Sequence, residues 1–291
     1  ILLIYFLLTI FLIFLYSLID IRLFDAFNLA FTTISSGGFI PTKNLTNILN
    51  SDLQIFVLST ALLIPIFNFY LLFNIFTRKF MLKNHQEDLH LSVLIILLTL
   101  FFYFFIIPND GFANVFLAIT SSISTSGIST HTSNFDISLF FILLTIIGGS
   151  LISTSSGIKY IRFYILLKIS YQEIYRLVKP INIFNKNLFN SETKISDNDS
   201  KIAFLVFVSF IISIFILSSI LTLDNINFEN AFKLSILTLT NTTASSLYGL
   251  DNLSFFDLNS FTKISLMLFM ILGKIEIITI LFLIKKFIFK E

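Results

Sequence analysis

Five apolar stretches, each about 20 residues long, constrain this chain more than any other feature of its sequence. A helix of that length crosses the roughly 30 Å hydrocarbon core of a lipid bilayer. Only 12% of the residues are charged, about half the share found in a soluble domain. The pattern excludes an ordinary soluble enzyme and predicts an all-α integral membrane protein. The stretches cover residues 1–19, 53–76, 89–107, 202–223 and 261–284.

A further apolar stretch is interrupted by small polar residues. Residues 137–147 are apolar, residues 148–157 are rich in Gly, Ser and Thr, and apolar sequence resumes at 158–169. Irregular backbone is tolerated inside a membrane only where protein or a water-filled cavity satisfies its polar groups. We therefore expect one helix broken inside the membrane. The alternative is a helix that ends at Ile147 and is followed by a cytoplasmic loop.

Lysine and arginine gather on connections that share one side of this arrangement. Cytoplasmic loops carry an excess of both residues, so residues 78–83, 159–201 and 285–290 are predicted to be cytoplasmic. The opposite connections hold more acidic than basic residues, which would concentrate cations at an external mouth. Because the chain begins at Ile1, already inside an apolar stretch, we expect it to be cropped at its N-terminus.

A short motif follows three of the apolar stretches on the predicted external side. It is a helix-compatible segment of about 12 residues, too short to span a bilayer, and it ends in small and hydroxyl residues. The copies are residues 24–39, 112–128 and 228–244. The chain thus repeats a unit of span, pore half-helix, small-residue loop and span three times.

This repeat has a physical use in moving ions. A half-helix that dips in from outside ends near the middle of the membrane, with the partial negative charge of its C-terminus pointing inward. Glycine in the following loop allows a left-handed backbone, and a ring of carbonyl oxygens can replace the water around a monovalent cation. Small residues also serve close helix packing, but three copies on the acidic side favour a selectivity filter.

Several motifs occur in the order and spacing of one family of membrane proteins. Residues 31–39 and 124–127 are similar to the second and third filter loops of that family. Residues 148–162 resemble its glycine-rich break, residues 177–181 the cytoplasmic segment after the break, and residues 273–276 the Gly-Arg-x-Glu motif of its last helix. The chain is therefore identified as a member of the Trk/Ktr/HKT potassium-transporter superfamily, with most resemblance to its bacterial Trk branch.

The resemblance implies a division of the chain into pore units. Residues 1–78 resemble the second family unit, residues 79–180 the third unit with its broken second helix, and residues 201–291 the fourth unit, with a cytoplasmic linker at 181–200. The first family unit is missing from the sequence. Because three filter loops cannot close a four-sided ring, either the sequence is cropped or another chain supplies the missing quarter.

The resemblance also implies the function and the surroundings of the protein. It implies potassium uptake through a multi-pass protein of the bacterial inner (plasma) membrane, which forms a homodimer and docks a cytoplasmic nucleotide-binding Trk regulatory subunit. Potassium is the transported ion, and no covalently bound cofactor is expected. The formal net charge of +2 gives no reason to expect a nucleic acid partner. The sequence lacks the motifs of a catalytic centre, so we expect no enzyme activity.

The candidate site residues fall into two groups. The first group is expected to bind potassium in the filter, mainly through backbone carbonyls. The second group is expected to form a gate beneath the filter. The filter candidates are Ser35, Ser36, Gly37, Gly38, Thr125, Ser126, Gly127, Asn241, Thr242 and Thr243; the gate candidates are Gly148, Gly149, Ser153, Gly157, Lys159 and Lys274.

Lys274 is unusual because it lies deep in the last apolar stretch. A charge there costs about 2.5–3.5 kcal/mol on insertion scales and usually faces a cavity. The resemblance implies that Lys274 lies beside the gate, in the position of the family's Arg. The alternative is that Lys274 extends to the membrane interface. We expect Glu276 to pair with a base on another helix, such as Lys159 or Arg162.

The fourth filter motif departs from the family at Thr243, which stands where the family has Gly. A Cβ in a left-handed conformation costs about 1–2 kcal/mol, so either this loop bends differently or the Thr243 hydroxyl serves as a ligand. The departure keeps two other functions open. One is a sodium-permeable transporter of the same superfamily, and the other is a non-conducting partial copy that acts as a membrane scaffold. A membrane enzyme acting on lipids is a weaker alternative, because no polar catalytic cluster is present.

Overall fold

The computed structural model describes residues 2–42, 44–77, 85–107, 110–130, 137–178, 187–189, 195–250 and 258–275, together with residues 279 and 286. Regular structure in these residues is helical and contains no strand; one isolated parallel bridge joins Ile147 and Ile158. The predicted all-α class is confirmed for this part of the chain.

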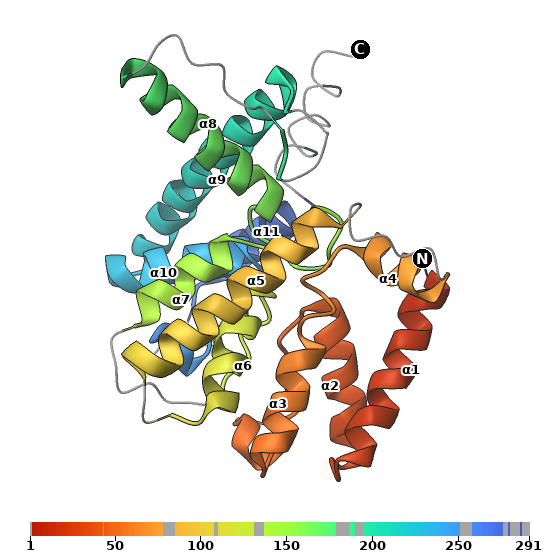
Figure 1. Ribbon diagram of the computed structural model, residues 1–291. Coiled ribbons are helices and arrows are strands. Elements are labelled where there is room, and N and C mark those ends of the chain that lie inside the picture. The colour runs from red at the N-terminus through yellow and green to blue at the C-terminus, as the bar shows by residue number, and fades with distance from the viewer. Residues whose placement is uncertain are drawn as a thin grey trace.

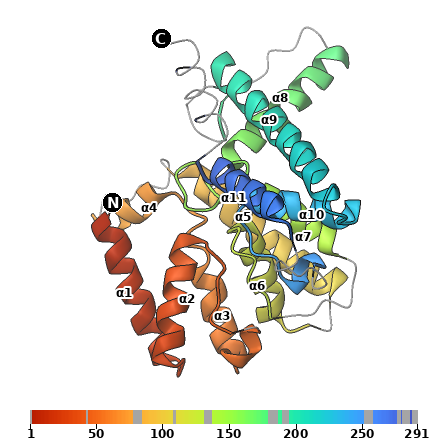
Figure 2. The same cartoon turned by 180° about the vertical axis from the view of Figure 1, so that it is seen from behind.

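The helices follow the apolar stretches, with short helices between long ones (Figure 1). Figure 2 shows the same helices from behind, with α11 beside α10, and in both views α8 and the start of α9 project away from the rest. The α-helices are α1 (Leu2–Leu18), α2 (Leu23–Ser35), α3 (Asp52–Ala61), α4 (Phe69–Phe76), α5 (Gln86–Phe101), α6 (Phe112–Ile123), α7 (Ser138–Ile146), α8 (Tyr160–Val178), α9 (Asp197–Thr222), α10 (Phe228–Leu239) and α11 (Ser260–Ile275); the short elements are η1 (Leu45–Asn47), the π-turn η3 (Phe102–Ile106) and η4 (Ser246–Tyr248).

Helices α2, α6 and α10 are the half-helices expected from the repeated motif. They contain 13, 12 and 12 residues, fewer than the roughly 20 that cross a bilayer. Each packs against the helix before it: α2 on α1, α6 on α5 and α10 on α9. The match of this pattern to particular family units stays a prediction.

The stretch at residues 53–76, which we expected to be one span, forms two helices instead. Helix α3 ends at Ala61, a series of turns follows, and α4 begins at Phe69. Pro65 lies in the turns, where its lack of an N–H group and its ring oppose a continuous helix. The backbone freed by this interruption bonds to residues 148–157, since Ile66 O accepts from Ser150 N at 2.8 Å and Phe69 N donates to Ile152 O at 2.7 Å.

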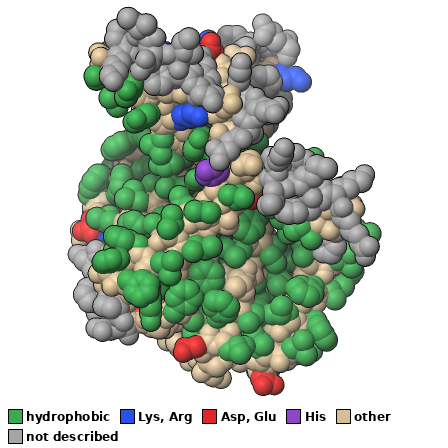
Figure 3. Space-filling model, viewed as in Figure 1, with side chains coloured by type: hydrophobic (Ala, Val, Ile, Leu, Met, Phe, Trp, Pro, Cys, Tyr) green, Lys and Arg blue, Asp and Glu red, His purple; other side chains and the backbone are tan. Residues whose placement is uncertain are grey.

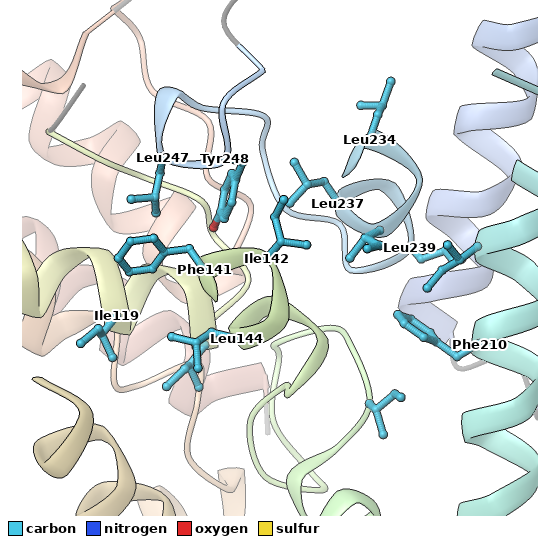
Figure 4. Packing of buried hydrophobic residues seen from close by; sticks show 14 of the residues in the cluster. Ile119, Phe141, Ile142, Leu144, Phe210, Leu234, Leu237, Leu239, Leu247 and Tyr248 are labelled. Carbon is cyan, nitrogen blue, oxygen red and sulfur yellow. The ribbon is translucent and has the colours of Figure 1, made fainter. Parts of the chain in front are cut away.

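Two large hydrophobic clusters hold the helices together, and a small third one joins α8 to the start of α9. One of the large clusters joins α1, α2 and α3. The other joins α5, α6, α7, α9 and α10, and it therefore holds two of the half-helices, α6 and α10. Figure 4 shows side chains of this second cluster meeting between α7, α10 and η4; the labelled ones are Ile119, Phe141, Ile142, Leu144, Phe210, Leu234, Leu237, Leu239, Leu247 and Tyr248.

The outer surface carries many large apolar side chains. Large exposed side chains include Phe14 on α1, Phe104 beside α5 and Phe204 on α9, each 60% or more exposed, and hydrophobic side chains cover most of the face in Figure 3. Monomeric soluble proteins rarely expose apolar patches larger than a few hundred Å². Among the described residues, Gln86–Ile106 and Asp197–Thr222 are long and apolar enough to cross a membrane. This surface suits contact with lipid.

Candidate functional site

The three half-helices end in the same way. The residue after each helix, or the next one, adopts a left-handed conformation: Ser36 at φ 51°, Thr125 at φ 59° and Asn241 at φ 52°. This conformation is uncommon outside glycine, and it ends each helix with a sharp turn. We name the segments at these turns loop A (residues 35–38), loop B (residues 125–127) and loop C (residues 241–243).

Loops A and B share a second left-handed position. Gly38 and Gly127 both have φ 72°, and each lies two residues after the left-handed cap of its half-helix. Gly38, rather than Gly37, is therefore the structural counterpart of Gly127. A Cβ at either glycine would lie under 3.0 Å from backbone atoms of a neighbouring loop, at Ser126 O or Thr243 O. Glycine at these positions permits both the backbone conformation and the close approach of the loops.

Loop C turns without the strain expected at Thr243. This residue follows Asn241 by two positions, as the glycines follow their caps, but it is not among the described residues with positive φ. Its Oγ1 donates a hydrogen bond to Ser126 O at 2.7 Å. Loop C therefore bends differently from loops A and B at this position.

The three loops meet at one cavity of about 1180 Å³. The far wall is the side of α11 that carries Met267, Met270 and Lys274, and the near wall is the segment after loop A. Thr125 and Ser126 are fully buried behind this surface. The filter candidates that line the cavity are Ser35, Ser36, Gly37, Gly38, Gly127, Asn241, Thr242 and Thr243.

Residues 148–157, named here the break loop, interrupt the helical path between α7 and α8. Hydrogen bonds close the base of the loop, from Gly148 N to Ile158 O and from Ile158 N to Ile146 O, both 2.9 Å. A Cβ at Gly149 would lie 2.4 Å from Ile66 O, so this glycine lets the loop press against the interruption between α3 and α4. The irregular backbone is thus satisfied by protein, as a membrane interior requires.

The break loop is bonded directly to loops A and B. Ser36 Oγ donates to Thr154 O at 3.0 Å, and Thr154 Oγ1 donates to Ile34 O at 3.0 Å. Thr125 Oγ1 accepts from Ser156 N at 3.0 Å. The left-handed residues that end α2 and α6 therefore also hold the break loop against the ends of these half-helices.

Lys274 joins α11 to the same point. Its ammonium donates to Thr154 O at 2.8 Å, and to Ser35 O and Ser36 Oγ at 3.4 Å. A lysine presents a compact point charge with three donors, and here these donors link loop A, the break loop and α11. The structure places Lys274 beside the break loop and on the cavity wall.

Lys159 holds the break loop from its other side. Only 6% exposed, it donates to Ser153 O and Ser153 Oγ at 3.1 Å and to Ser155 O at 2.8 Å. These bonds satisfy a buried charge that would otherwise be costly. Glu276, the partner that we expected for Lys159 or Arg162, lies outside the described residues.

Sequence reasoning missed two acidic residues that anchor the same region. Glu87 Oε1 accepts from Leu151 N at 3.0 Å, and Asp88 Oδ1 accepts from Asn68 N at 2.8 Å. Asp88 is buried and also lies 3.4 Å from the imidazole of His85. Acidic residues in the first turn of an apolar helix are expensive in a membrane unless they are paired, and that cost was the signal available in the sequence.

Comparison with known proteins shows which proteins this chain is similar to. No family model matches the chain. The chain is 27% identical over 293 residues to the Trk system potassium uptake protein TrkG of Escherichia coli K12, a match covering 95% of this chain and 58% of that protein. It is 25% identical over 279 residues to the Trk system potassium uptake protein TrkH of Halomonas elongata, covering 89% and 55%.

A solved structure shows the same fold. The crystal structure of the potassium transporter TrkH from Vibrio parahaemolyticus matches with a TM-score of 0.83 at 24% sequence identity, covering 95% of this chain and 61% of that one. The chain therefore spans less than two thirds of the length of these relatives. The chain therefore shares the helical fold of this solved structure. The chain is thus similar to Trk system potassium uptake proteins, in agreement with the resemblance of its motifs.

Proposed function

We propose that this chain forms most of a potassium-uptake pore in the bacterial inner membrane. The observation that carries the proposal is the convergence of three half-helix ends on one cavity, with matching left-handed caps at Ser36, Thr125 and Asn241. Each helix end contributes a partial negative charge, and each loop contributes backbone carbonyls that can replace the water around potassium. Loops A, B and C are then three parts of one filter.

The break loop is the proposed gate. It lies against loops A and B and is held by Lys159 and Lys274, so it would stand directly below an ion that leaves the filter. The candidates Gly148, Gly149, Ser153 and Gly157 act through the loop's shape. For Gly157 the reason is a left-handed backbone at φ 81°, which favours glycine.

The boundaries of the cavity support a place for a fourth filter unit. The cavity is bounded by the segment after loop A on one side and by α11 on the other, with loop B behind. We propose that a fourth filter unit closes this space, with residues 1–78, 79–180 and 201–291 as units two, three and four and residues 181–200 as a cytoplasmic linker. In the same proposal the protein is multi-pass, forms a homodimer, and docks a cytoplasmic nucleotide-binding regulatory subunit near that linker.

One specific observation favours a second candidate function. The Thr243 side chain, where the family has Gly, reaches Ser126 O in loop B. A side chain in the ring changes the oxygens that face an ion, so sodium permeation is the alternative to strict potassium uptake. Competition of sodium against rubidium flux separates these two functions, whereas a membrane scaffold shows no flux under any gradient.

Replacement of Gly127 tests the filter. In Gly127→Val the new Cβ would lie 2.5 Å from Thr243 O, at a backbone φ of 72° that disfavours any side chain. We expect rubidium uptake to be abolished in a host without its own potassium uptake, with the protein expressed from its complete reading frame.

A second glycine supplies the matched control. Gly111 precedes α6 on the same half-helix, and a Cβ there meets only Asn114 Nδ2, at 3.8 Å. Gly111→Val should therefore keep its uptake. Unchanged uptake in Gly127→Val, at normal protein level in the membrane, would refute the filter assignment.

A further inference from the structure

The Thr243 hydroxyl lies where loops A, B and C come together. Besides its 2.7 Å bond to Ser126 O, Oγ1 lies 2.6 Å from the position that a Cβ on Gly38 would take and 2.7 Å from that of a Cβ on Gly127. The side chain of loop C therefore fills the space that the two glycines leave open. Gly38, Gly127 and Thr243 each lie two residues after the left-handed cap of their half-helix. The two glycines have no side chain, so of these three residues Thr243 is the one that brings a side chain to this point.

The Thr243 hydroxyl donates to Ser126 O, a carbonyl oxygen that the proposed filter would use to bind a cation. Ser126 O lies 1.7 Å from the position of a Cβ on Gly38, so this carbonyl points across from loop B toward loop A. A carbonyl oxygen in a filter gives its lone pair to a dehydrated cation. Here one of its two lone pairs already accepts the proton of the Thr243 hydroxyl.

Hydrogen bonds to neighbouring residues fix the position of loop C, and with it the contact between Thr243 and Ser126. Asn241 Nδ2 donates to Met270 O on α11 at 2.8 Å, and the hydroxyls of Thr240 and Thr242 lie 2.8 Å apart. These bonds fix the residues just before Thr243 to α11 and to the end of α10. The reach of Thr243 toward loop B is thus set by loop C as a whole.

We propose that the Thr243 side chain occupies an ion's place in the filter and competes with a monovalent cation for the Ser126 carbonyl. The inference rests on the proposed function, since it needs loops A, B and C to bind ions. A cation that enters must turn the hydroxyl away and break its bond to Ser126 O. Thr243 therefore weakens cation binding, and a smaller residue at this position strengthens it.

The test measures ion binding rather than transport. The protein is expressed from its complete reading frame and purified in detergent, and its melting temperature is titrated with rubidium chloride against choline chloride at equal ionic strength. Thr243→Ala should lower the rubidium concentration for half-maximal stabilisation about five-fold, the factor that one neutral hydrogen bond contributes. Thr243→Val removes the same hydrogen bond but keeps the volume of the side chain, so it should give a smaller gain than Thr243→Ala.

A matched substitution and two internal comparisons make the outcomes distinct. Thr222→Ala removes a hydroxyl that bonds to Ser219 O inside α9, and it should titrate like the unmodified protein. A variant that melts in choline at the unmodified temperature is folded. If the unmodified protein responds to rubidium and Thr243→Ala shows no gain, or Thr243→Val shows an equal one, the inference is overturned while the proposed function stands. If neither the unmodified protein nor any variant responds to rubidium, the proposed function fails and the inference fails with it.

Discussion

Removing the ammonium of Lys274 should open the proposed gate. Lys274→Met keeps an unbranched apolar side chain of similar length on α11 but deletes the donors to Thr154 O, Ser35 O and Ser36 Oγ. Ser35 is exposed and Thr154 is half-buried, so their carbonyl oxygens can bond to water once the ammonium is gone. The substitution therefore loosens the break loop from α11 without creating a new defect.

The size of the effect follows from the geometry of the three bonds. A hydrogen bond from a charged donor contributes about 1.5–3 kcal/mol, and the contacts at 3.4 Å add little because they are long. Lys274 faces an open cavity, so solvent screening favours the lower end, about 1.5 kcal/mol. Since about 1.4 kcal/mol corresponds to a factor of ten, the open arrangement should become about ten-fold more populated.

Rubidium uptake in a host without its own potassium uptake measures this change. We expect about a ten-fold higher initial rate for Lys274→Met at equal protein level in the membrane. Lys201→Met is the matched control, because Lys201 is exposed near the start of α9. An unchanged or lower rate in Lys274→Met would show that Lys274 does not hold the gate closed.

Two further substitutions separate gating from stability. Thr154→Val removes the hydroxyl that donates to Ile34 O at 3.0 Å, a loss of about 1 kcal/mol, and it should raise rubidium uptake by a smaller factor than Lys274→Met; a rate equal to that of the unmodified protein would contradict the bond's role. Ser51→Ala removes the capping box that Ser51 forms with Gln54 at the start of α3, and it should lower the free energy of unfolding by about 1 kcal/mol, seen as a lower melting temperature with an unchanged ratio of rubidium to sodium flux.

The features of the fold that depend on residues close together in the sequence were predictable. The length of the apolar stretches predicts the half-helices and the interruption at Gly148. The cost of a charged group in lipid marks Lys274 as a residue that should face a cavity. The split between α3 and α4 was missed, although Pro65 marks it, because the apolar run continues through the turn.

The bonds of the candidate site were not predictable in the same way. Thr243 and Ser126 are 117 positions apart, and Ser36 and Thr154 are 118 apart. Such contacts depend on how whole helices pack, and periodicity within a segment carries no information about them. The sequence thus indicated that Thr243 departs from the glycine pattern, but only the packed loops show that its hydroxyl reaches a carbonyl of loop B.

The contacts of Lys274 also bear on the order in which the molecule can assemble. Lys274 is separated from Ser35 by 239 positions and from Thr154 by 120, and contacts of such long range form late in folding. A ribosome releases loop A and the break loop well before it reaches α11. During synthesis, then, these contacts are absent while α1 to α10 form, and only the arrival of α11 joins loop A and the break loop to this helix.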